Sequence, residues 1–443
     1  MKYLRAECLH NQKFPEKQDC MKITDIANKL GDSEDRYLLL LGILGGVLII
    51  AIQLYLNEFQ PDPLKTVMIA LLLIIGLGIL VFLRKRTDQV GLKLAYLGAI
   101  YIILAYLSWP TRYDWPTWHD QGHYLTMVQE LSQGYLTPYG FRMGLGYPLI
   151  TVPFYLLIGK DGLFIPNLLA FSGTLYFSYL LFKSLADDLI AKISVLFIIF
   201  ATTLPYHHVI WWNHGPVIFL LVALSYLALK RSTNGRLLLA GAIVGLAFFT
   251  RYLDAVVFLP ILAFIIWRSE SSKLKGAFLA FVAALPFIVV PFVVQWIVFG
   301  DPLMSPYKYS FNNPLRLFWF ENIPSHFLLT FVYFPEKLSI AMLGAQKETV
   351  LIAMFYVIFA PLGAYLFYRF SNKKGLIGTM IASVVICILY SSAFWEFHSG
   401  TFGPFPTDFR YLLLAYPFMV FFSIIGLFSF LKIRQFKKEE EKK

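Results

Sequence analysis

Long apolar runs recur along almost the whole chain and are separated by short polar stretches. A run of about 20 apolar residues is long enough to cross a hydrocarbon core of about 30 Å as an α-helix. The pattern therefore predicts an all-α polytopic membrane protein with about twelve transmembrane helices. The predicted spans are Tyr37–Leu56, Lys65–Leu83, Leu94–Trp109, Gly162–Phe182, Leu189–Tyr206, Gly215–Leu229, Leu237–Thr250, Asp254–Trp267, Gly276–Val298, Thr349–Tyr368, Gly375–Ala393 and Tyr411–Leu431.

Two further apolar runs, Leu145–Ile158 and Phe327–Leu343, are short or interrupted by charge and proline. Short or broken helices at membrane depth are tolerated where they are buried in protein or line a cavity. We therefore expect these two runs to be re-entrant or juxtamembrane segments.

Basic residues fall in alternate connections between the predicted spans. Lys and Arg concentrate in the cytoplasmic connections of membrane proteins, so this alternation predicts that both termini are cytoplasmic. The chain then divides into a cytoplasmic tail over residues 1–36, one membrane domain over 37–431 and a basic cytoplasmic tail over 432–443. The basic positions are Arg84, Lys85, Arg86, Lys93, Lys183, Lys192, Lys230, Arg231, Arg236, Arg268, Lys273, Lys275, Arg369, Lys373, Lys374 and those from Lys432 to Lys443.

The composition agrees with a membrane domain, because 58% of the residues are hydrophobic and only 15% are charged. Orientation in the membrane and attraction to anionic lipid account for the net charge of +11, so no nucleic-acid partner is expected. Cys8 and Cys20 lie in the predicted N-terminal tail and Cys387 lies within a predicted span. No disulfide is therefore expected.

The polar, aromatic segment Pro110–Pro148 interrupts the run of spans. A turn between two helices needs few residues, so a long connection rich in Trp, Tyr, His and Asp indicates a function. The charge pattern places it on the external face of a cell membrane, together with Pro205–Pro216, Thr250–Asp254, Gly300–His326 and Trp395–Arg410. Aromatic residues also populate membrane interfaces without a catalytic role, and that alternative stays open.

A helix is predicted to begin at Asp120 within this loop and to lie on the membrane surface. Apolar residues over Tyr124–Leu131 recur every three to four positions, and Gly134 follows where a helix would stop. Aspartate is a favoured N-cap, and a helix N-terminus favours an ionised carboxylate. A capping role and a catalytic role for Asp120 are therefore compatible.

No cofactor is expected. His119 and His123 are four residues apart, a spacing that suits zinc, but no third ligand lies near them in the sequence. A divalent metal is an open alternative that the sequence does not favour. The chain also lacks a phosphate-binding glycine loop, because its glycine-rich run Gly42–Gly46 lies inside a predicted span.

Two arginines are candidate phosphate-binding residues. Arg251 lies between two predicted spans and three residues before Asp254, so the two are expected to pair on one helix face. An ionisable residue at membrane depth is costly and indicates a function. Arg410, after Asp408, precedes the last predicted span in a similar way. A guanidinium can give a phosphate two parallel hydrogen bonds, whereas snorkelling at the interface is the alternative role.

Four stretches resemble the motifs of one family of membrane enzymes. They are HDQGHYLTMVQELSQGYL in the first external loop, GLAFFTRYLDAVVFLP (Gly245–Pro260), FGDPLMSPY (Phe299–Tyr307) and FRYLLLAYP (Phe409–Pro417). In this order they resemble integral-membrane glycosyltransferases of the GT-C type, above all the dolichyl-phosphate-mannose-dependent protein mannosyltransferases and the lipid A aminoarabinose transferases. The resemblance extends from about Leu94 to Leu431.

The resemblance implies an inverting transfer of a sugar from a polyprenyl-phosphate-linked donor in the membrane lipid to an acceptor hydroxyl of a protein, lipid or glycan. It implies that Asp120 is the base and that Arg251 and Arg410 bind the donor phosphate. Residues that would contact the acceptor or support these side chains are Asp114, His119, His123, Tyr124, Glu396 and His398.

The chain departs from the family pattern in two places. The family usually has an acidic pair in the first loop, whereas here Gln121 follows Asp120, and Asp114 is six residues away. This difference weakens a metal-dependent mechanism. Two additional spans, Tyr37–Leu56 and Lys65–Leu83, precede the span that normally comes first.

Two other functions stay open. Twelve spans with both termini inside are also the topology of major-facilitator transporters. The charges here lie at the predicted span ends rather than at the midplane, however, which argues against a transporter. A lipid-linked glycan polymerase or ligase is the other alternative.

Overall fold

The computed structural model describes residues 89–108, 120–270, 272–304, 355–393 and 412–440. The chain divides into two compact units, Met1–Lys93 and Leu94–Lys443, and nearly all described residues belong to the second. In the described part the regular elements are all helices, and only an isolated bridge pairs Ser232 with Ser269. The prediction of an all-α protein is therefore confirmed for these residues.

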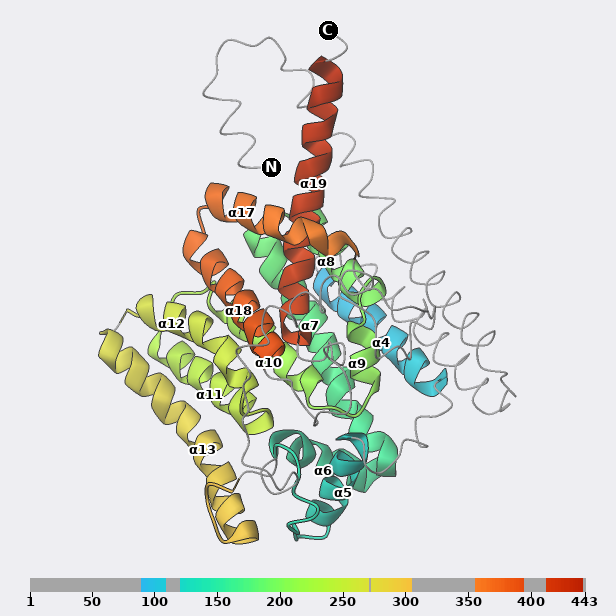
Figure 1. Cartoon of the computed structure of the whole chain (residues 1–443), viewed down its shortest axis with the longest axis vertical. Coiled ribbons are helices and arrows are strands. Elements are labelled where there is room, and N and C mark those ends of the chain that lie inside the picture. The colour runs from blue at the N-terminus through green and yellow to red at the C-terminus, as the bar shows by residue number, and fades with distance from the viewer. Residues whose placement is uncertain (1–88, 109–119, 271, 305–354, 394–411, 441–443) are drawn as a thin grey trace. The chain divides into compact units, whose positions relative to one another are not determined.

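Figure 1 labels the α-helices of the described part. In chain order the helical elements are α4 (Val90–Ser108), α5 (Asp120–Ser132), α6 (Gly146–Ile158), η2 (Gly159–Leu163), α7 (Phe164–Leu185), α8 (Asp188–Phe200), α9 (Leu204–Val209), α10 (His214–Leu227), α11 (Asn234–Thr250), η3 (Asp254–Phe258), α12 (Leu259–Trp267), α13 (Lys273–Phe299), η5 (Phe355–Phe359), α17 (Ala360–Phe370), α18 (Lys374–Ala393), η7 (Leu413–Ala415) and α19 (Tyr416–Glu440). Most of the predicted spans in the described part coincide with one of these helices to within a few residues.

Four helical segments of the described part are long and apolar enough to cross a membrane: Val90–Leu107, Gly146–Leu185, Lys273–Phe299 and Leu413–Leu431. Shorter apolar helices are His214–Leu227, Asn234–Thr250, Asp254–Trp267 and Lys374–Tyr390. These segments identify a membrane protein, but they do not confirm twelve spans. The predicted spans Tyr37–Leu56 and Lys65–Leu83 and the run Phe327–Leu343 lie outside the described residues.

The run Leu145–Ile158 forms the helix α6, and its re-entrant or juxtamembrane placement stays a prediction. Gly159 has a positive φ of 66° and separates α6 from α7 through the short η2. Gly162 lies against the backbone of Phe154, so a side chain at position 162 would collide with α6. The two glycines therefore allow α6 to fold closely against the start of α7.

The prediction of one continuous span over Leu189–Tyr206 is wrong. The first helix of this region, α8, ends at Phe200, and the short α9 begins at Leu204. Pro205 has no N–H, so a helix continuing from α8 would lose a backbone hydrogen bond there. The Thr202 hydroxyl instead donates to the Ile198 carbonyl at 2.8 Å and accepts from the Leu204 N–H at 3.1 Å.

Helices α7 and α10 run side by side in the same direction. Near their N-termini, the Asn167 amide donates to the Ile210 carbonyl at 2.6 Å. Towards their C-termini, the rings of Phe177 and Tyr226 lie 5.5 Å apart. The connections that follow the two helices therefore lie at the same end of the bundle.

Two more connections, those after α12 and α17, lie beside the connections that follow α7 and α10. Lys373, after α17, donates to the Ser184 carbonyl near the end of α7. The connection after α12 contacts the one after α10, because Arg268 Nη1 donates to the Ala228 carbonyl at 3.0 Å and Glu270 forms an ion pair with Arg231. We call these four connections the basic end. Their clustering agrees with the alternation of charge, while the membrane side that they face stays a prediction.

The opposite end, which we call the polar end, contains the described parts of the predicted external segments. Helices α5 and α6, residues 201–213 and the turn at 250–254 lie there. The ring of Phe141, between α5 and α6, stacks on Phe299 at the end of α13 at 5.6 Å. Segments far apart in the sequence thus meet at this end.

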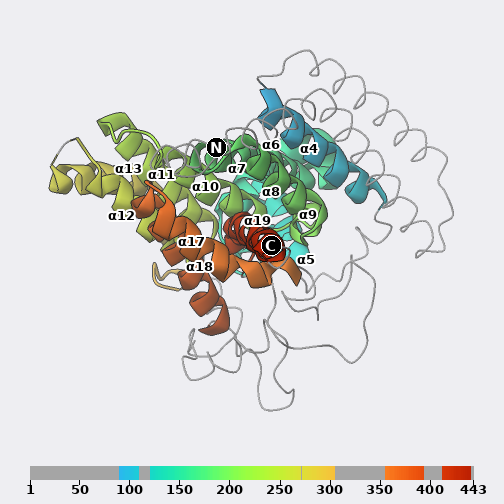
Figure 2. The same cartoon turned by 90° about the horizontal axis from the view of Figure 1, so that it is seen from above.

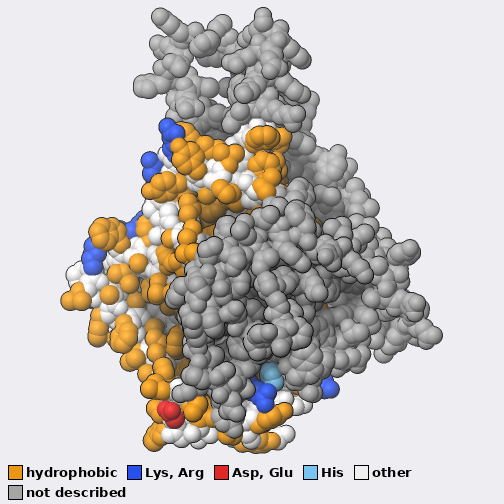
Figure 3. All heavy atoms as spheres, viewed as in Figure 1, with side chains coloured by type: hydrophobic (Ala, Val, Ile, Leu, Met, Phe, Trp, Pro, Cys, Tyr) orange, Lys and Arg blue, Asp and Glu red, His pale blue; other side chains and the backbone are white. Residues whose placement is uncertain are grey.

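Helix α13 presents a long apolar face to its surroundings. Exposed along it are Phe278, Phe281, Leu285, Val289, Val293 and Trp296. Its other face approaches α11 closely, because a side chain at Gly245 would lie 2.8 Å from the Ala284 Cα. In Figure 3 hydrophobic side chains cover much of the described surface in view, and Lys and Arg appear at its upper left and at its lower edge. Such a face suits contact with lipid tails.

The core of the second unit surrounds the first half of α19, which Figure 2 shows nearly end-on. The ring of Phe421 stacks on Phe182 of α7 at 4.4 Å and meets Phe367 of α17 edge-on at 5.5 Å. Gly363 and Gly426 bring the backbones of α17 and α19 into contact, so a side chain at either position would collide with the other helix. Small residues of this kind allow close helix packing in membranes.

Candidate functional site

The turn after α11 brings the guanidinium of Arg251 close to several polar side chains. The helix ends at Thr250, and Arg251 turns to an extended conformation with φ −150° and ψ 101°. The short η3 begins three residues later at Asp254, and Pro260 follows in the first turn of α12. Arg251 therefore lies in a break between two short helices, where its side chain can turn towards other elements.

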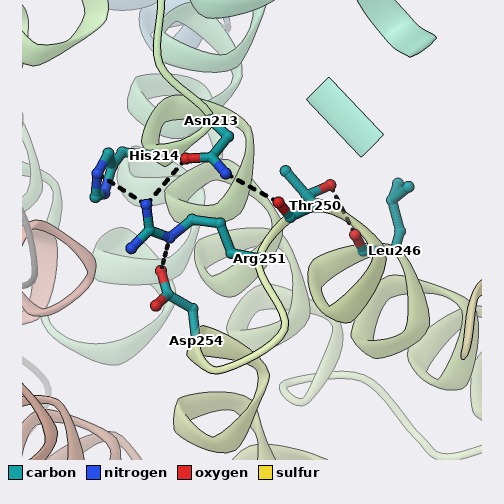
Figure 4. Close-up of polar contacts among 6 residues, drawn as sticks. All are labelled: Asn213, His214, Leu246, Thr250, Arg251 and Asp254. Atoms are coloured by element: carbon teal, nitrogen blue, oxygen red, sulfur yellow. Dashed lines mark hydrogen bonds and ion pairs between the residues drawn. The ribbon is translucent and has the colours of Figure 1, made fainter. Parts of the chain in front are cut away.

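Three contacts hold the Arg251 side chain (Figure 4). Its Nε donates to Asp254 Oδ2 at 2.5 Å. Its Nη1 donates to Asn213 Oδ1 at 2.9 Å and contacts His214 Nε2 at 2.9 Å. Because the guanidinium is planar, contacts at Nε and Nη1 together fix its orientation.

The Arg251–Asp254 pair is buried. The exposed fraction is 13% for the side chain of Arg251 and 2% for that of Asp254. The two residues were expected to share one helix face, and this is wrong in detail, because the ion pair crosses the break between α11 and η3. The tight turn brings the two side chains together without a common helix.

Asn213 joins the cluster to the end of α11. Its Nδ2 donates to the Thr250 carbonyl at 2.9 Å, while its Oδ1 accepts from Arg251. Asn213 occupies the N-cap position of α10, yet its side chain makes no capping hydrogen bond. Asn213 is 1% exposed, and its side chain thus stabilises the turn at 250–254 rather than the start of its own helix.

The connection before α6 packs on the same turn. A side chain at Gly144 would collide with the Thr250 carbonyl, and one at Gly146 would lie 2.8 Å from the Thr250 Cα. The hydroxyl of Thr250 turns back to the Leu246 carbonyl at 2.8 Å (Figure 4). The start of α6 and the end of α11 therefore meet through main-chain atoms and the Thr250 hydroxyl.

Helix α5 begins at Asp120 and ends before Gly134, which has a φ of 81°, and so the helix lies where the apolar spacing predicts it. Asp120 is half-buried in its first turn, where a carboxylate is favoured by the helix dipole. Tyr124 is 2% exposed, and its ring meets Tyr147 of α6 edge-on at 5.0 Å. Tyr124 thus anchors α5 to α6.

Gln121 directly follows Asp120 in the first turn of α5. It is 2% exposed, and its Oε1 accepts a long hydrogen bond of 3.4 Å from the Trp211 N–H. Trp211 lies two residues before Asn213. This contact links the start of α5, and so the region of Asp120, to the segment that holds Arg251.

The segment after α5 is held by Glu130. Its carboxylate accepts from the Thr137 N–H at 2.7 Å and from the Thr137 hydroxyl at 2.8 Å. A side chain at Gly140 would collide with this carboxylate. Glu130 is 9% exposed and therefore belongs to the framework of the loop.

Two histidines that the sequence places on this end are buried. His208 is 0% exposed, and its Nδ1 contacts the Leu204 carbonyl at 2.8 Å. Burial lowers the pKa of His208 to about 4, so the ring is neutral at pH 7. His207 is 8% exposed, and its ring lies 5.4 Å from that of Trp212. Both side chains form part of the packed interior.

The structure describes four of the predicted site residues, Asp120, His123, Tyr124 and Arg251. It brings α5 and the Arg251 cluster to the same end, linked through Gln121 and Trp211. The other predicted site residues lie outside the described part: Asp114, His119, Glu396, His398 and Arg410. The sequence prediction missed Asn213, although an asparagine just before a helix is a recognisable cap signal.

A metal site is not formed by the described residues, in which no three or more His, Cys, Asp and Glu side chains come together as ligands. The neutral amide of Gln121 adds no charge beside Asp120. His119, the partner in the zinc-like spacing, lies outside the described part.

Comparison with known families gives one match. Residues 146–296 match the model of the dolichyl-phosphate-mannose-protein mannosyltransferase family, from the start of α6 almost to the end of α13. The matched segment contains Asn213, His214, Arg251 and Asp254, and α5 precedes it. No curated protein and no solved structure matches the chain. Over residues 146–296 the chain thus resembles the dolichyl-phosphate-mannose-protein mannosyltransferases of GT-C type, a family that implies membrane glycosyltransferase activity.

Proposed function

We propose that the protein transfers a sugar from a polyprenyl-phosphate-linked donor to an acceptor hydroxyl at the polar end, on the external face of the membrane. The observation that carries the proposal is that the family match includes the buried Arg251 cluster, and that Gln121 and Trp211 connect this cluster to the helix that begins at Asp120. Donors of this type lie in the bilayer, and the exposed apolar face of α13 suits the lipid tail.

Arg251 supplies a cation for the donor phosphate. Its side chain is 13% exposed, so an interaction with phosphate is screened by water much less than at an open surface. Asp254, Asn213 and His214 hold the guanidinium before the donor arrives, and preorganised donors stabilise developing charge efficiently. Because Asp254 neutralises part of this charge, we assign a second cation, Arg410, to the same phosphate.

Asp120 removes the acceptor proton. The acceptor oxygen forms a bond to the anomeric carbon as the bond from that carbon to the phosphate oxygen breaks. The proton passes to the Asp120 carboxylate, and polyprenyl phosphate leaves with the bonding electron pair. Attack from the face opposite the phosphate inverts the configuration at the anomeric carbon. A positioned base contributes about 10²–10⁴-fold to such a step.

The remaining predicted residues have supporting roles in this scheme. We assign Tyr124 to positioning, because its buried ring packs α5 on α6. His123 lies on α5 one turn after Asp120 and is assigned to the acceptor side, together with Asp114, His119, Glu396 and His398. The acceptor is a hydroxyl of a protein, lipid or glycan.

The test compares two aspartates that begin helices. Asp120→Asn keeps the size and much of the capping ability of the side chain but removes the base. Asp187 is the matched control, because it caps α8 through a hydrogen bond from the Ile190 N–H at 2.8 Å and lies at the basic end. Transfer is measured on purified protein with a panel of radiolabelled polyprenyl-phosphate sugars.

Turnover should collapse by about 10²-fold or more in Asp120→Asn and stay near the wild-type value in Asp187→Asn. Stability should change by about 1 kcal/mol or less in both variants. Near-normal turnover in Asp120→Asn would remove Asp120 as the base. Absence of transfer from every donor in the panel would contradict the proposed reaction itself.

A further inference from the structure

Asn213 uses its side chain in an unusual way for a residue in its position. An asparagine at the N-cap of a helix usually accepts a hydrogen bond from one of the first free N–H groups of that helix. The side chain of Asn213 makes no such bond in α10. It instead joins the Thr250 carbonyl at 2.9 Å to Arg251 Nη1 at 2.9 Å.

We propose that Asn213 is a positioning residue that sets the orientation of the Arg251 guanidinium for the donor phosphate. The inference rests on the proposed phosphate-binding role of Arg251. Asp254 accepts a hydrogen bond from Arg251 Nε, at one edge of the guanidinium. The bond from Nη1 to Asn213 adds a second point of attachment, and two such points define the plane of the group.

The amide is itself held in one orientation. Its Nδ2 donates to a backbone carbonyl, so its Oδ1 must face Arg251. The Thr250 carbonyl belongs to the last residue of α11, directly before Arg251. Asn213 therefore holds the side chain of Arg251 in a fixed position relative to the end of α11. His214, the next residue, adds a second contact to the same Nη1.

The chain offers a matched control in Asn167. Its side chain is 0% exposed, and its Nδ2 donates to the backbone carbonyl of Ile210 at 2.6 Å. Asn213 and Asn167 are thus two buried amides that each donate to a main-chain carbonyl at the polar end. Of the two, Asn213 is the one with a hydrogen bond to Arg251. Loss of folding alone would affect Asn167→Ala and Asn213→Ala alike.

The experiment measures binding to the full-length protein in detergent micelles. The probes are undecaprenyl phosphate and undecaprenol, and the ratio of their dissociation constants reports recognition of the phosphate alone. The variants are Asn213→Ala, Asn167→Ala, Arg251→Lys and Arg251→Lys/Asn213→Ala. A lysine keeps a charge for Asp254 but lacks the Nη1 that Asn213 binds. If Asn213→Ala does not accumulate, Asn213→Ser, which is too short to reach both partners, replaces it.

We expect Asn213→Ala to lower the preference for undecaprenyl phosphate by about tenfold, since a hydrogen bond to a charged group is worth about 1.5 kcal/mol or more. Asn167→Ala should keep the wild-type preference. In the Arg251→Lys background, Asn213→Ala should have a much smaller effect, because a lysine has no planar fork whose orientation Asn213 could fix.

Two results would overturn the inference. One is a wild-type preference in Asn213→Ala, and the other is an equal loss on adding Asn213→Ala to wild type and to Arg251→Lys. Both would leave the phosphate-binding role of Arg251 intact. If the wild-type protein itself does not distinguish the two lipids, that role fails first, and the inference fails with it.

Discussion

Replacing Arg251 tests whether the buried ion pair has a structural role, a functional role or both. Arg251→Gln removes the cation but leaves Asp254, whose side chain is only 2% exposed, without its charged partner. Removing one member of a buried ion pair typically costs about 3–5 kcal/mol, because the remaining charge is buried and uncompensated. We therefore expect a clear loss of stability in this variant.

The expected loss can be placed on a temperature scale. A change of 1 kcal/mol moves the melting temperature by about 2–4 °C for proteins of 150–250 residues. Arg251→Gln should then lower the apparent melting temperature in detergent by about 6–20 °C. The matched control is Arg231→Gln, because the side chain of Arg231 in the Arg231–Glu270 pair is 80% exposed. An exposed pair contributes about 1 kcal/mol or less, so this control should melt close to the wild type.

The double variant Arg251→Gln/Asp254→Asn separates stability from function. It removes both charges, so most of the lost stability should return. Binding of undecaprenyl phosphate should not return, because the cation is still missing. Equal melting temperatures for Arg251→Gln and Arg231→Gln would refute the argument from burial. Recovery of phosphate binding in the double variant would refute the role of Arg251 at the donor phosphate.

Two further predictions concern acid stability and orientation. Burial lowers the pKa of His208 from its ordinary value of 6.5 to about 4. Between these two pH values the unfolded chain binds a proton that the folded chain does not. The free energy of unfolding should therefore be unaffected by His208 above pH 6.5 and should fall by about 3 kcal/mol as the pH drops to 4. Melting curves between pH 7 and 4 check this, and His208→Gln should reduce the slope, whereas an unchanged slope would contradict it. In a cysteine-free background, an impermeant thiol reagent on intact cells should label Gln133→Cys at the polar end but not Thr233→Cys at the basic end, and the reverse pattern would invert the predicted topology.

The sequence predicted individual helices well where their apolar runs are long. The bounds predicted for α4, α10, α11, α13 and α18 agree with the structure to within a few residues. The helix from Asp120 to the positive-φ Gly134 was equally predictable, because a favoured first residue and a C-terminal glycine mark both of its ends. Local signals were sufficient in these cases.

Contacts between distant segments were harder to predict. The pairing of Arg251 with Asp254 follows from their spacing, but its path across a helix break does not. Asn213 lies 38 residues before Arg251, and the sequence gives no sign that the two side chains meet. The break before α9 was missed because the residues around Pro205 are apolar enough to hide it. Burial of His207 and His208 likewise depends on packing between helices.

The glycines at 144 and 146 have a consequence for how such a site can diversify. Where they meet Thr250, the fit between α6 and α11 depends mainly on main-chain atoms, which every amino acid shares, and on the Thr250 hydroxyl. In the proposed transferase, substitutions elsewhere around the polar end can therefore alter which sugar or acceptor is accepted without moving this contact. The two glycines themselves do not tolerate substitution, since any side chain there would push the helices apart. The residues that recognise the substrates can then change during evolution while the contact between Thr250 and the two glycines stays constant.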